Sequence, residues 1–140
     1  MRERNEDSYL VLTAPALTPE IDALLAVADG MGGYQAGEVA SAYLVEQLDQ
    51  LFTSLAYKQE VHYSPEHADY YAAVLKEVLE RINEGLYTLA SSQQELRGMG
   101  TTATVALVTG QRLFIGHVGD SRAYLLRSGN LQRLTHDHTW

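Results

Sequence analysis

Residues 27–33 read Val27-Ala28-Asp29-Gly30-Met31-Gly32-Gly33, and the chain is organised around them. The apolar run before the acid, residues 23–28, has the length and composition of a buried strand. The glycines after the acid end the strand and expose backbone. Burying a carboxylate at a strand end is unfavourable unless the charge is paired. A divalent cation is one possible partner, and the Gly30 carbonyl could be its second oxygen ligand. A tight turn in which Asp29 caps the following helix explains the same residues equally well.

The composition is that of a globular domain. Of the 140 residues, 46% are hydrophobic and 20% are charged, which suffices for one domain with a core. The net charge of −8 argues against a nucleic-acid partner but leaves open a phosphorylated substrate whose charge is met by metal ions. There is no cysteine, which excludes disulfides and thiol chemistry. We expect a cytoplasmic protein, because the acidic start is unlike a signal peptide and no apolar run reaches membrane-spanning length.

Further acids precede the first predicted strand. Glu6 and Asp7 come directly before residues 8–13, which are rich in β-branched and aromatic side chains, and a loop with two prolines leads to the strand at 21–28. If these two strands pair as a hairpin, Glu6 and Asp7 lie near Asp29. Three carboxylates in one place repel each other unless a cation binds. A solvated strand start is the alternative for Glu6 and Asp7.

The rest of the chain is predicted to contain two helices followed by four strands. Apolar residues at three- and four-residue spacing predict one helix over 37–55 and a second from Ser64, its N-cap, to about 91. The strands are expected at 103–108, 113–118, 121–127 and 131–134, the last two forming a hairpin. The first of them is almost continuously apolar, as for a strand covered on both faces. No repeat, low-complexity tract or linker divides the chain.

Two other places carry residues of metal-binding type. Asp120 follows an apolar strand and a glycine, as a second site where an acid stands at a strand end. His136, Asp137 and His138 have the composition of a metal cluster. Because adjacent residues chelate one ion awkwardly, a polar loop is the better interpretation of these three.

Five motifs occur in one order along the chain. They are Arg2-x-x-Asn5-Glu6-Asp7, Asp29-Gly30-Met31-Gly32-Gly33, Gly98-Met99-Gly100-Thr101-Thr102, Gly119-Asp120-Ser121-Arg122-Ala123-Tyr124 and Leu134-Thr135-x-Asp137-His138. Together they resemble the bacterial branch of the metal-dependent type-2C protein phosphatases, the PPM family. Each motif alone is weak, but five at sensible spacing are a strong signal. The resemblance runs from Arg2 to the last residue and covers the N-terminal portion of that family's single catalytic domain.

The resemblance implies a fold and a metal site. The fold is α+β, a β-sandwich flanked by helices in α/β/β/α layers, which residues 1–140 hold only in part. Two Mn²⁺ or Mg²⁺ ions sit at one end of the sandwich, and a third binds more weakly. The implied metal-site positions are Asp29 as the bridging ligand, Gly30 through its carbonyl, Glu6 as a ligand, Asp7 holding metal-bound water, and Asp120 at the third ion.

The resemblance also implies an activity. The family hydrolyses phosphoserine and phosphothreonine in proteins without a covalent intermediate, through a metal-activated water that attacks phosphorus in line. Arg2 matches the arginine that binds the substrate phosphate, so that Arg2, Asp7 and Asp29 are the implied catalytic residues. The expected partner is a phosphorylated protein, such as the substrate of a serine/threonine kinase.

Three departures from the family pattern limit what this chain is expected to do. Met31 stands where many eukaryotic members have a histidine assigned as general acid, although bacterial members commonly have methionine there. The usual first strand is missing before Arg2, and the chain ends before the later acidic motifs that complete the metal site. We therefore expect a fragment that is inactive alone and self-associates through surface exposed by the truncation. A non-catalytic phosphoprotein-binding or regulatory module with the same fold is the alternative.

Overall fold

The computed structural model describes residues 5–33, 35–54 and 69–138. Arg2 and the predicted helix start at Ser64 lie outside these residues. The elements follow in the order β1 (Asp7–Thr13), β2 (Ala23–Met31), α1 (Ala36–Thr53), α3 (Tyr70–Ser92), the 3₁₀ turn η1 (Gln94–Leu96), β3 (Gly100–Thr101), β4 (Ala103–Thr109), β5 (Arg112–Val118), β6 (Tyr124–Arg127) and β7 (Asn130–Arg133).

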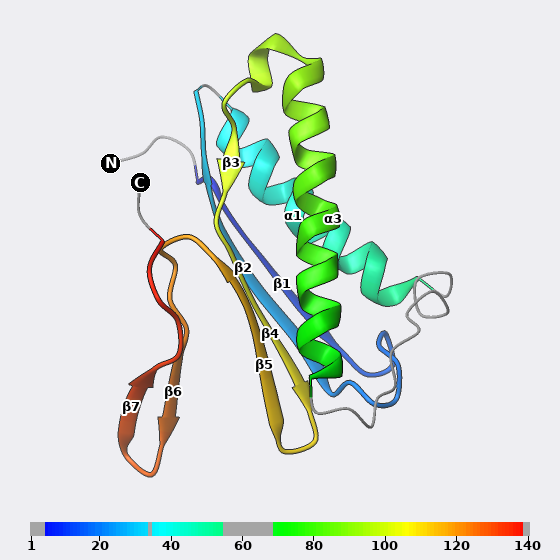
Figure 1. Ribbon diagram of the computed structural model, residues 1–140, viewed down its shortest axis with the longest axis vertical. Coiled ribbons are helices and arrows are strands. Elements are labelled where there is room, and N and C mark those ends of the chain that lie inside the picture. The colour runs from blue at the N-terminus through cyan, green and yellow to red at the C-terminus, as the bar shows by residue number, and fades with distance from the viewer. Residues whose placement is uncertain (1–4, 34, 55–68, 139–140) are drawn as a thin grey trace.

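The strands form one main antiparallel sheet and one separate hairpin (Figure 1). The main sheet has the order β1-β2-β4-β5, and the short β3 pairs with the end of β2. Strands β1 and β2 pair from Asp7 opposite Asp29 to Thr13 opposite Ala23, which confirms the predicted hairpin. Strands β6 and β7 pair only with each other.

Strand β2 does not end at Asp29 as predicted. It continues to Met31, because Gly30 and Met31 pair with Thr101 and Gly100 of β3. Helix α1 then begins only at Ala36, after a different N-cap residue, Gln35. Asp29 is therefore a residue within a paired strand, and the alternative that it caps the following helix is wrong.

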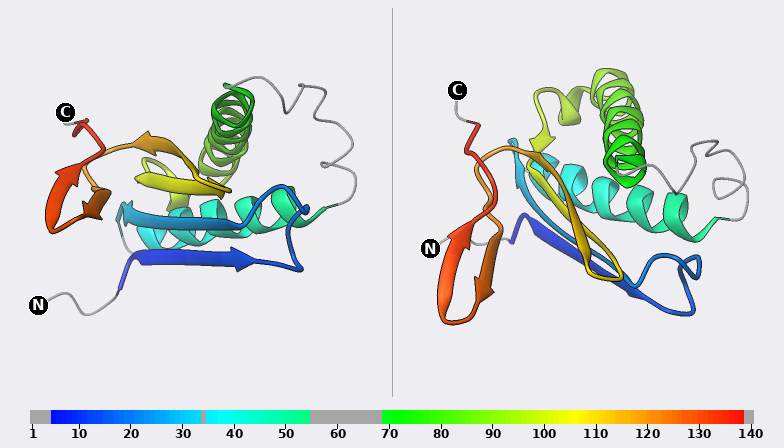
Figure 2. Two further views of the ribbon diagram at one scale, coloured as in Figure 1. Left: turned by 90° about the horizontal axis from the view of Figure 1, so that it is seen from below. Right: turned by 60° about the horizontal axis from the view of Figure 1, so that its bottom comes forward.

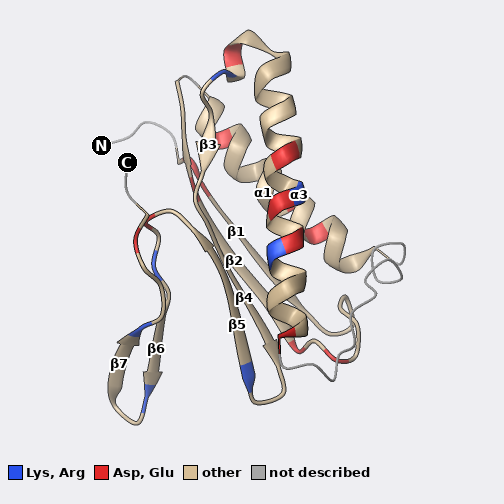
Figure 3. Cartoon of the chain, in the orientation of Figure 1, with Lys and Arg blue, Asp and Glu red and all other residues tan. Residues whose placement is uncertain are grey.

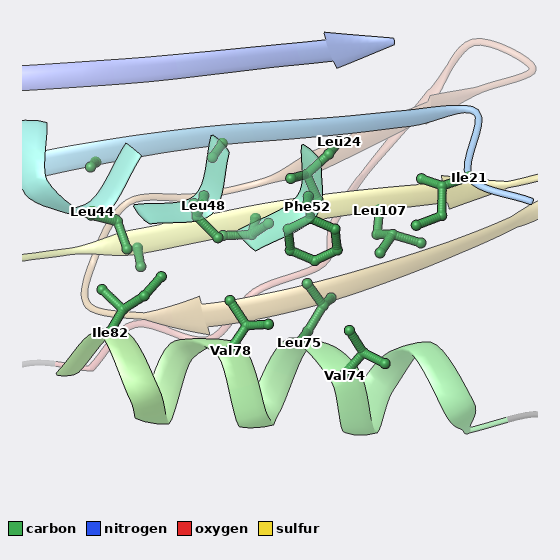
Figure 4. Packing of buried hydrophobic residues seen from close by; sticks show 14 of the residues in the cluster. Ile21, Leu24, Leu44, Leu48, Phe52, Val74, Leu75, Val78, Ile82 and Leu107 are labelled. Atoms are coloured by element: carbon green, nitrogen blue, oxygen red, sulfur yellow. The ribbon is translucent and has the colours of Figure 1, made fainter. Parts of the chain in front are cut away.

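Helices α1 and α3 cover one face of the main sheet (Figures 1 and 2). Helix α1 contacts β1 and β2, whereas α3 contacts β5 and also packs against α1. Their apolar stripes bury the helix-facing side chains of the sheet, as Figure 4 shows for Leu24 and Leu107 among Leu44, Leu48, Phe52, Val74, Leu75, Val78 and Ile82. This core fixes the strand ends at which the acids lie.

The opposite face of the sheet is apolar and open to solvent. Because side chains alternate along a strand, residues of β1, β2 and β5 with the same parity share this face. The large apolar side chains exposed there are Tyr9 at 76%, Val11 at 59%, Val27 at 47%, and Leu25 and Leu113 at 41% each. The described chain thus contains one main sheet, a separate hairpin and one helical layer, consistent with an incomplete form of the predicted α+β fold.

Strand β4 is fully covered on one face only. Val105 and Leu107 are fully buried beneath the helices. On the other face Thr104 is buried, whereas Ala106 and Val108 remain partly exposed. The prediction that this strand is covered on both faces is therefore wrong for the described chain.

The charged residues are distributed differently over α3 and the β6–β7 hairpin. No helix in residues 5–33, 35–54 or 69–138 is both long enough and apolar enough to cross a membrane. Acidic and basic residues are interspersed along α3, whereas the β6–β7 hairpin carries arginine and no acid (Figure 3).

Candidate metal centre

Two acidic residues face each other where β1 begins, opposite the last part of β2. Asp7 lies directly opposite Asp29 in the antiparallel register. Side chains of directly opposed residues lie on the same face of a sheet, with Cβ atoms about 5 Å apart. That face is the open one, since Asp7 alternates with exposed Tyr9 and Val11 along β1. The hairpin therefore brings two acids to one solvent-accessible strand end.

Glu6 is held beside this pair through its backbone. Its carbonyl accepts hydrogen bonds from the Gly30 N–H at 3.1 Å and from the Ser41 hydroxyl of α1 at 2.6 Å. The Glu6 carboxyl lies against Gly37, where the Cβ of any larger residue would lie only 2.9 Å from Glu6 Oε1. The start of β1, the end of β2 and the start of α1 thus meet at Glu6.

Two glycines permit this close approach. A Cβ on Gly30 would overlap the backbone carbonyl of Gly37, and a Cβ on Gly37 would lie 2.9 Å from the Gly30 carbonyl carbon. Neither glycine has room for a side chain, so α1 can start directly against the strand end. Sequence analysis singled out Gly30 as a source of a carbonyl ligand, but the packing role of Gly37 has no local sequence signal.

Thr102 holds the backbone of Asp29. The Asp29 N–H donates to Thr102 Oγ1 at 2.9 Å, and the Thr102 N–H donates to the Asp29 carbonyl at 3.0 Å. The Thr102 hydroxyl also shares a hydrogen bond of 2.9 Å with Ser121 Oγ. Sequence analysis placed Thr102 and Ser121 inside motifs but assigned their hydroxyls no role.

A cleft of about 270 Å³ lies over the paired acids. Its walls are formed by Asn5, Asp7, Ser8, Tyr9, Val27, Ala28, Asp29 and Ser121. Asp120 is exposed on the turn after β5, next to the cleft residue Ser121. Within residues 5–33, 35–54 and 69–138, no three acidic or histidine side chains are gathered closely enough to hold an ion. The structure thus brings Asp7 and Asp29 together, places Glu6 beside them, and leaves Asp120 at the rim.

The atoms around this cleft suit a hard divalent cation. The polar side chains among the cleft residues carry carboxylate, hydroxyl and amide oxygens, and none carries sulfur or imidazole. Oxygen donors of this kind are preferred by Mg²⁺ and Mn²⁺, whereas Zn²⁺ and Cu²⁺ favour nitrogen and sulfur. Asn5 is already engaged, because its side-chain oxygen accepts the Asp7 N–H at 2.9 Å. The residues present therefore fit Mg²⁺ or Mn²⁺ held chiefly by acids.

The histidine-rich segment forms contacts other than a metal cluster. His138 Nδ1 accepts the Gly119 N–H at 3.1 Å, and the His138 N–H donates to the Gly119 carbonyl at 2.8 Å. His117 Nε2 lies 3.1 Å from the His136 carbonyl oxygen, and the rings of His117 and His138 are 5.2 Å apart. These contacts tie the segment to the end of β5, and residues 134–138 form neither helix nor strand.

Asp137 is paired with Arg122. The guanidinium donates from Nε to Asp137 Oδ1 at 3.1 Å and from Nη2 to Oδ2 at 2.8 Å. This two-point contact lowers the pKa of the Asp137 carboxyl and raises that of Arg122. Arg122 therefore anchors the last described segment to the turn that carries Asp120.

Comparison with known proteins identifies the family. Residues 2–140 match the family described as Protein phosphatase 2C. The chain is 34% identical over 142 residues to the serine/threonine phosphatase stp of Listeria welshimeri, an alignment that covers 99% of this chain and 51% of the relative.

Solved structures agree with this match. Serine/threonine phosphatase Stp1 from Staphylococcus aureus superimposes with a TM-score of 0.79 at 35% identity, covering 98% of this chain and 49% of that one. The catalytic domain of serine threonine protein phosphatase PstP in complex with two manganese ions gives a TM-score of 0.72 at 36% identity, covering 100% and 52%. The chain thus spans about half the length of the relatives it matches. Over that span it is a member of the protein phosphatase 2C family, as its five motifs predicted.

Proposed function

We propose that this chain contributes the Asp7–Asp29 part of the active site of a metal-dependent protein serine/threonine phosphatase. The observation that carries the proposal is the direct pairing of Asp7 with Asp29 at an open strand end. Like charges opposite each other in a sheet repel, so a bound cation would stabilise this pairing. The proposal is further supported by relatives named as serine/threonine phosphatases.

The residues proposed to hold two Mn²⁺ or Mg²⁺ ions are Asp29, Glu6, Asp7 and the Gly30 carbonyl, with Asp120 at a third and weaker position. When bound, such ions polarise phosphoryl oxygens and lower the pKa of a coordinated water. The chain's own contribution is to fix the acids: Ser41 holds the Glu6 backbone, and Thr102 holds that of Asp29.

Arg2 is proposed to bind the substrate phosphate. A guanidinium can contact two phosphate oxygens at once in a planar fork, which an ammonium group cannot reproduce. In a protein extended to the length of its relatives, Arg2→Lys should therefore raise the KM for a phosphopeptide more than it lowers the Tm. An unchanged KM would contradict a phosphate-binding role.

A non-catalytic phosphoprotein-binding module is the second candidate. It is favoured by the observation that, among the described residues, no three acids converge on one point. A module of this kind would bind a phosphopeptide without hydrolysing it. The cysteine-free sequence fits the reducing cytoplasm as the place of action for either candidate.

Hydrolysis of an aryl phosphate distinguishes the two candidates. p-Nitrophenyl phosphate and Mn²⁺ would be supplied to this chain and to a chimera that adds the C-terminal half of the Listeria welshimeri relative. We expect Mn²⁺-dependent turnover by the chimera, loss of turnover in its Asp29→Asn variant, and none by the 140-residue chain alone. Phosphopeptide binding without turnover by the chimera would favour the second candidate.

A further inference from the structure

Thr102 occupies the one position where the strand opposite β2 is interrupted. The register on either side, Gly30 opposite Thr101 and Val27 opposite Thr104, places Thr102 directly opposite Asp29. The Asp29 N–H donates to the Thr102 hydroxyl, and the Thr102 carbonyl instead accepts the Thr101 hydroxyl at 2.9 Å. A side chain thus takes the place of the main chain as the hydrogen-bond acceptor for Asp29.

The same hydroxyl reaches the turn that carries Asp120. Thr102 Oγ1 lies 2.9 Å from Ser121 Oγ, and either group can be the donor. The neighbouring Gly119 has a φ of +110° and packs on the Thr102 side chain so closely that a Cβ there would clash. Thr102 is only 3% exposed, so none of these contacts is readily replaced by water.

These contacts join two places that are remote in sequence. Asp29 and Thr102 are 73 residues apart, and Thr102 and Ser121 are 19 apart. A backbone N–H shielded from water is unfavourable without an acceptor, so the Asp29 backbone prefers the conformation that reaches the hydroxyl. The position of the Asp29 carboxylate is therefore linked to that of the Gly119–Ser121 turn through one oxygen atom.

We infer that Thr102 is a positioning residue that couples Asp29 to the Asp120 turn. Thr102 is not itself a metal ligand. It contacts the backbone of Asp29 and the side chain of Ser121, the residue after Asp120. The inference rests on the proposed function for the claim that cations bind at these acids. Its consequence is that removing the Thr102 hydroxyl weakens cation binding without removing any acid.

The chain offers a matched set of variants. Thr102→Val keeps the shape of the side chain and removes the hydroxyl, whereas Thr102→Ser keeps the hydroxyl. Thr104→Val is the control, because Thr104 is buried nearby in β4 and bonds His117 Nδ1 at 2.9 Å, away from Asp29. Both valine variants lose a buried hydroxyl, so a general loss of stability affects both alike.

Two readouts separate positioning from stability. Mn²⁺ titration of the dilute chain, followed by water proton relaxation, should give a Kd raised about tenfold or more in Thr102→Val, as is typical when a group supporting a metal ligand is lost. Thr102→Ser should stay near the wild-type value, and Thr104→Val should leave the Kd unchanged. Hydrogen exchange at the Asp29 amide, measured by NMR without metal, should accelerate in Thr102→Val only.

Each result has a defined meaning. A wild-type Kd in Thr102→Val, or equal weakening in Thr104→Val, would overturn the inference. If Thr102→Val does not fold, Ser121→Ala replaces it and should weaken Mn²⁺ binding while leaving the Asp29 amide protected. If neither the wild-type chain nor the chimera with the Listeria welshimeri C-terminal half binds Mn²⁺, the metal site of the proposed function fails. The exchange rates then still decide whether Thr102 holds Asp29.

Discussion

Asp29 and Asp120 both follow apolar runs in the sequence, but their surroundings differ. Asp29 is half-buried, lies opposite Asp7 and has its backbone N–H and carbonyl both bonded to Thr102. Asp120 is exposed on a turn. A carboxylate held in place beside a second one contributes more to cation binding than one that must first be ordered.

Asp29→Asn should therefore weaken Mn²⁺ binding more than Asp120→Asn does. We expect Asp29→Asn to lower the Mn²⁺ affinity more than about tenfold, as is typical when a metal site is disturbed. Asp120→Asn should lower this affinity less. Titration calorimetry on the chimera with the Listeria welshimeri C-terminal half would measure both. Equal losses would contradict the ranking.

The Arg122–Asp137 pair predicts a pH dependence. Because the pair lowers the folded-state pKa of Asp137, it adds stability above the carboxyl's ordinary value of 3.8, and this stability is lost as the pH falls below that value. Asp137→Asn should lower the Tm at neutral pH, and the difference from wild type should fade in acid. Added salt should also reduce this difference in Tm, since Arg122 and Asp137 are both solvent-accessible. A difference that is constant across pH would exclude the ion pair as its cause.

At the scale of residues, the sequence predicted acids but not the hydroxyls that hold them. Asp7 and Asp29 could be placed together because they flank two adjacent strands. Ser41 contacts Glu6 across 35 residues, and Thr102 contacts Asp29 across 73. Serine and threonine give a local signal only at helix caps and turns, so contacts over such separations leave no pattern to read. The metal-binding roles of the acids themselves remain predictions.

At the scale of elements, α1 packs closely against the start of β1 and the end of β2 because Gly37 has no side chain. Gly37→Ala should lower stability by about 1–3 kcal/mol, the usual cost of overpacking, although alanine favours helix. It should also weaken Mn²⁺ binding, since its Cβ would push on the Glu6 carboxyl. Thermal unfolding and Mn²⁺ titration would test this. Gly33→Ala is the control because nothing lies within 4 Å of its Cβ, and an equal loss there would contradict the argument.

The strand boundaries that sequence analysis missed have tertiary causes. Strand β6 starts at Tyr124 and not at 121, because the preceding residues bond to the end of the described chain. The Ala123 N–H donates to Thr135 Oγ1 at 3.2 Å, and the Leu134 N–H donates to the Ala123 carbonyl at 2.9 Å. An alternating pattern of apolar and polar residues does not indicate whether the segment forms hydrogen bonds with a strand or with a loop. The hairpin of β1 and β2 was predictable because its partners are neighbours in sequence.

At the scale of the whole molecule, the open sheet face dominates the expected behaviour of the chain. Apolar side chains cover it from β1 across to β5, and the described sheet also presents two edge strands. Contiguous exposed apolar surface and unpaired edges both promote association. The same face carries Asp7 and Asp29 at one end, so whatever covers it also borders the cleft.

The 140-residue chain should therefore self-associate, and adding the C-terminal half of the Listeria welshimeri relative as a separate chain should reduce this and restore Mn²⁺-dependent hydrolysis. Sedimentation velocity and the aryl phosphate assay on the same samples would follow both. Val11→Lys, on the open face away from the cleft, should reduce association without adding activity. A monomeric, sharply melting and active 140-residue chain would contradict the prediction.

The pairing of β1 with β2 also has a consequence for the order of folding. Only residues 14–22 separate the two strands, so this hairpin can form early, before the distant β4 is in place. In a hairpin that forms first, Asp7 and Asp29 would face each other before the core is in place, and their repulsion would oppose this step. A divalent cation that relieves this repulsion would act on the folding nucleus and raise the rate at which the protein folds, as well as the stability of the product.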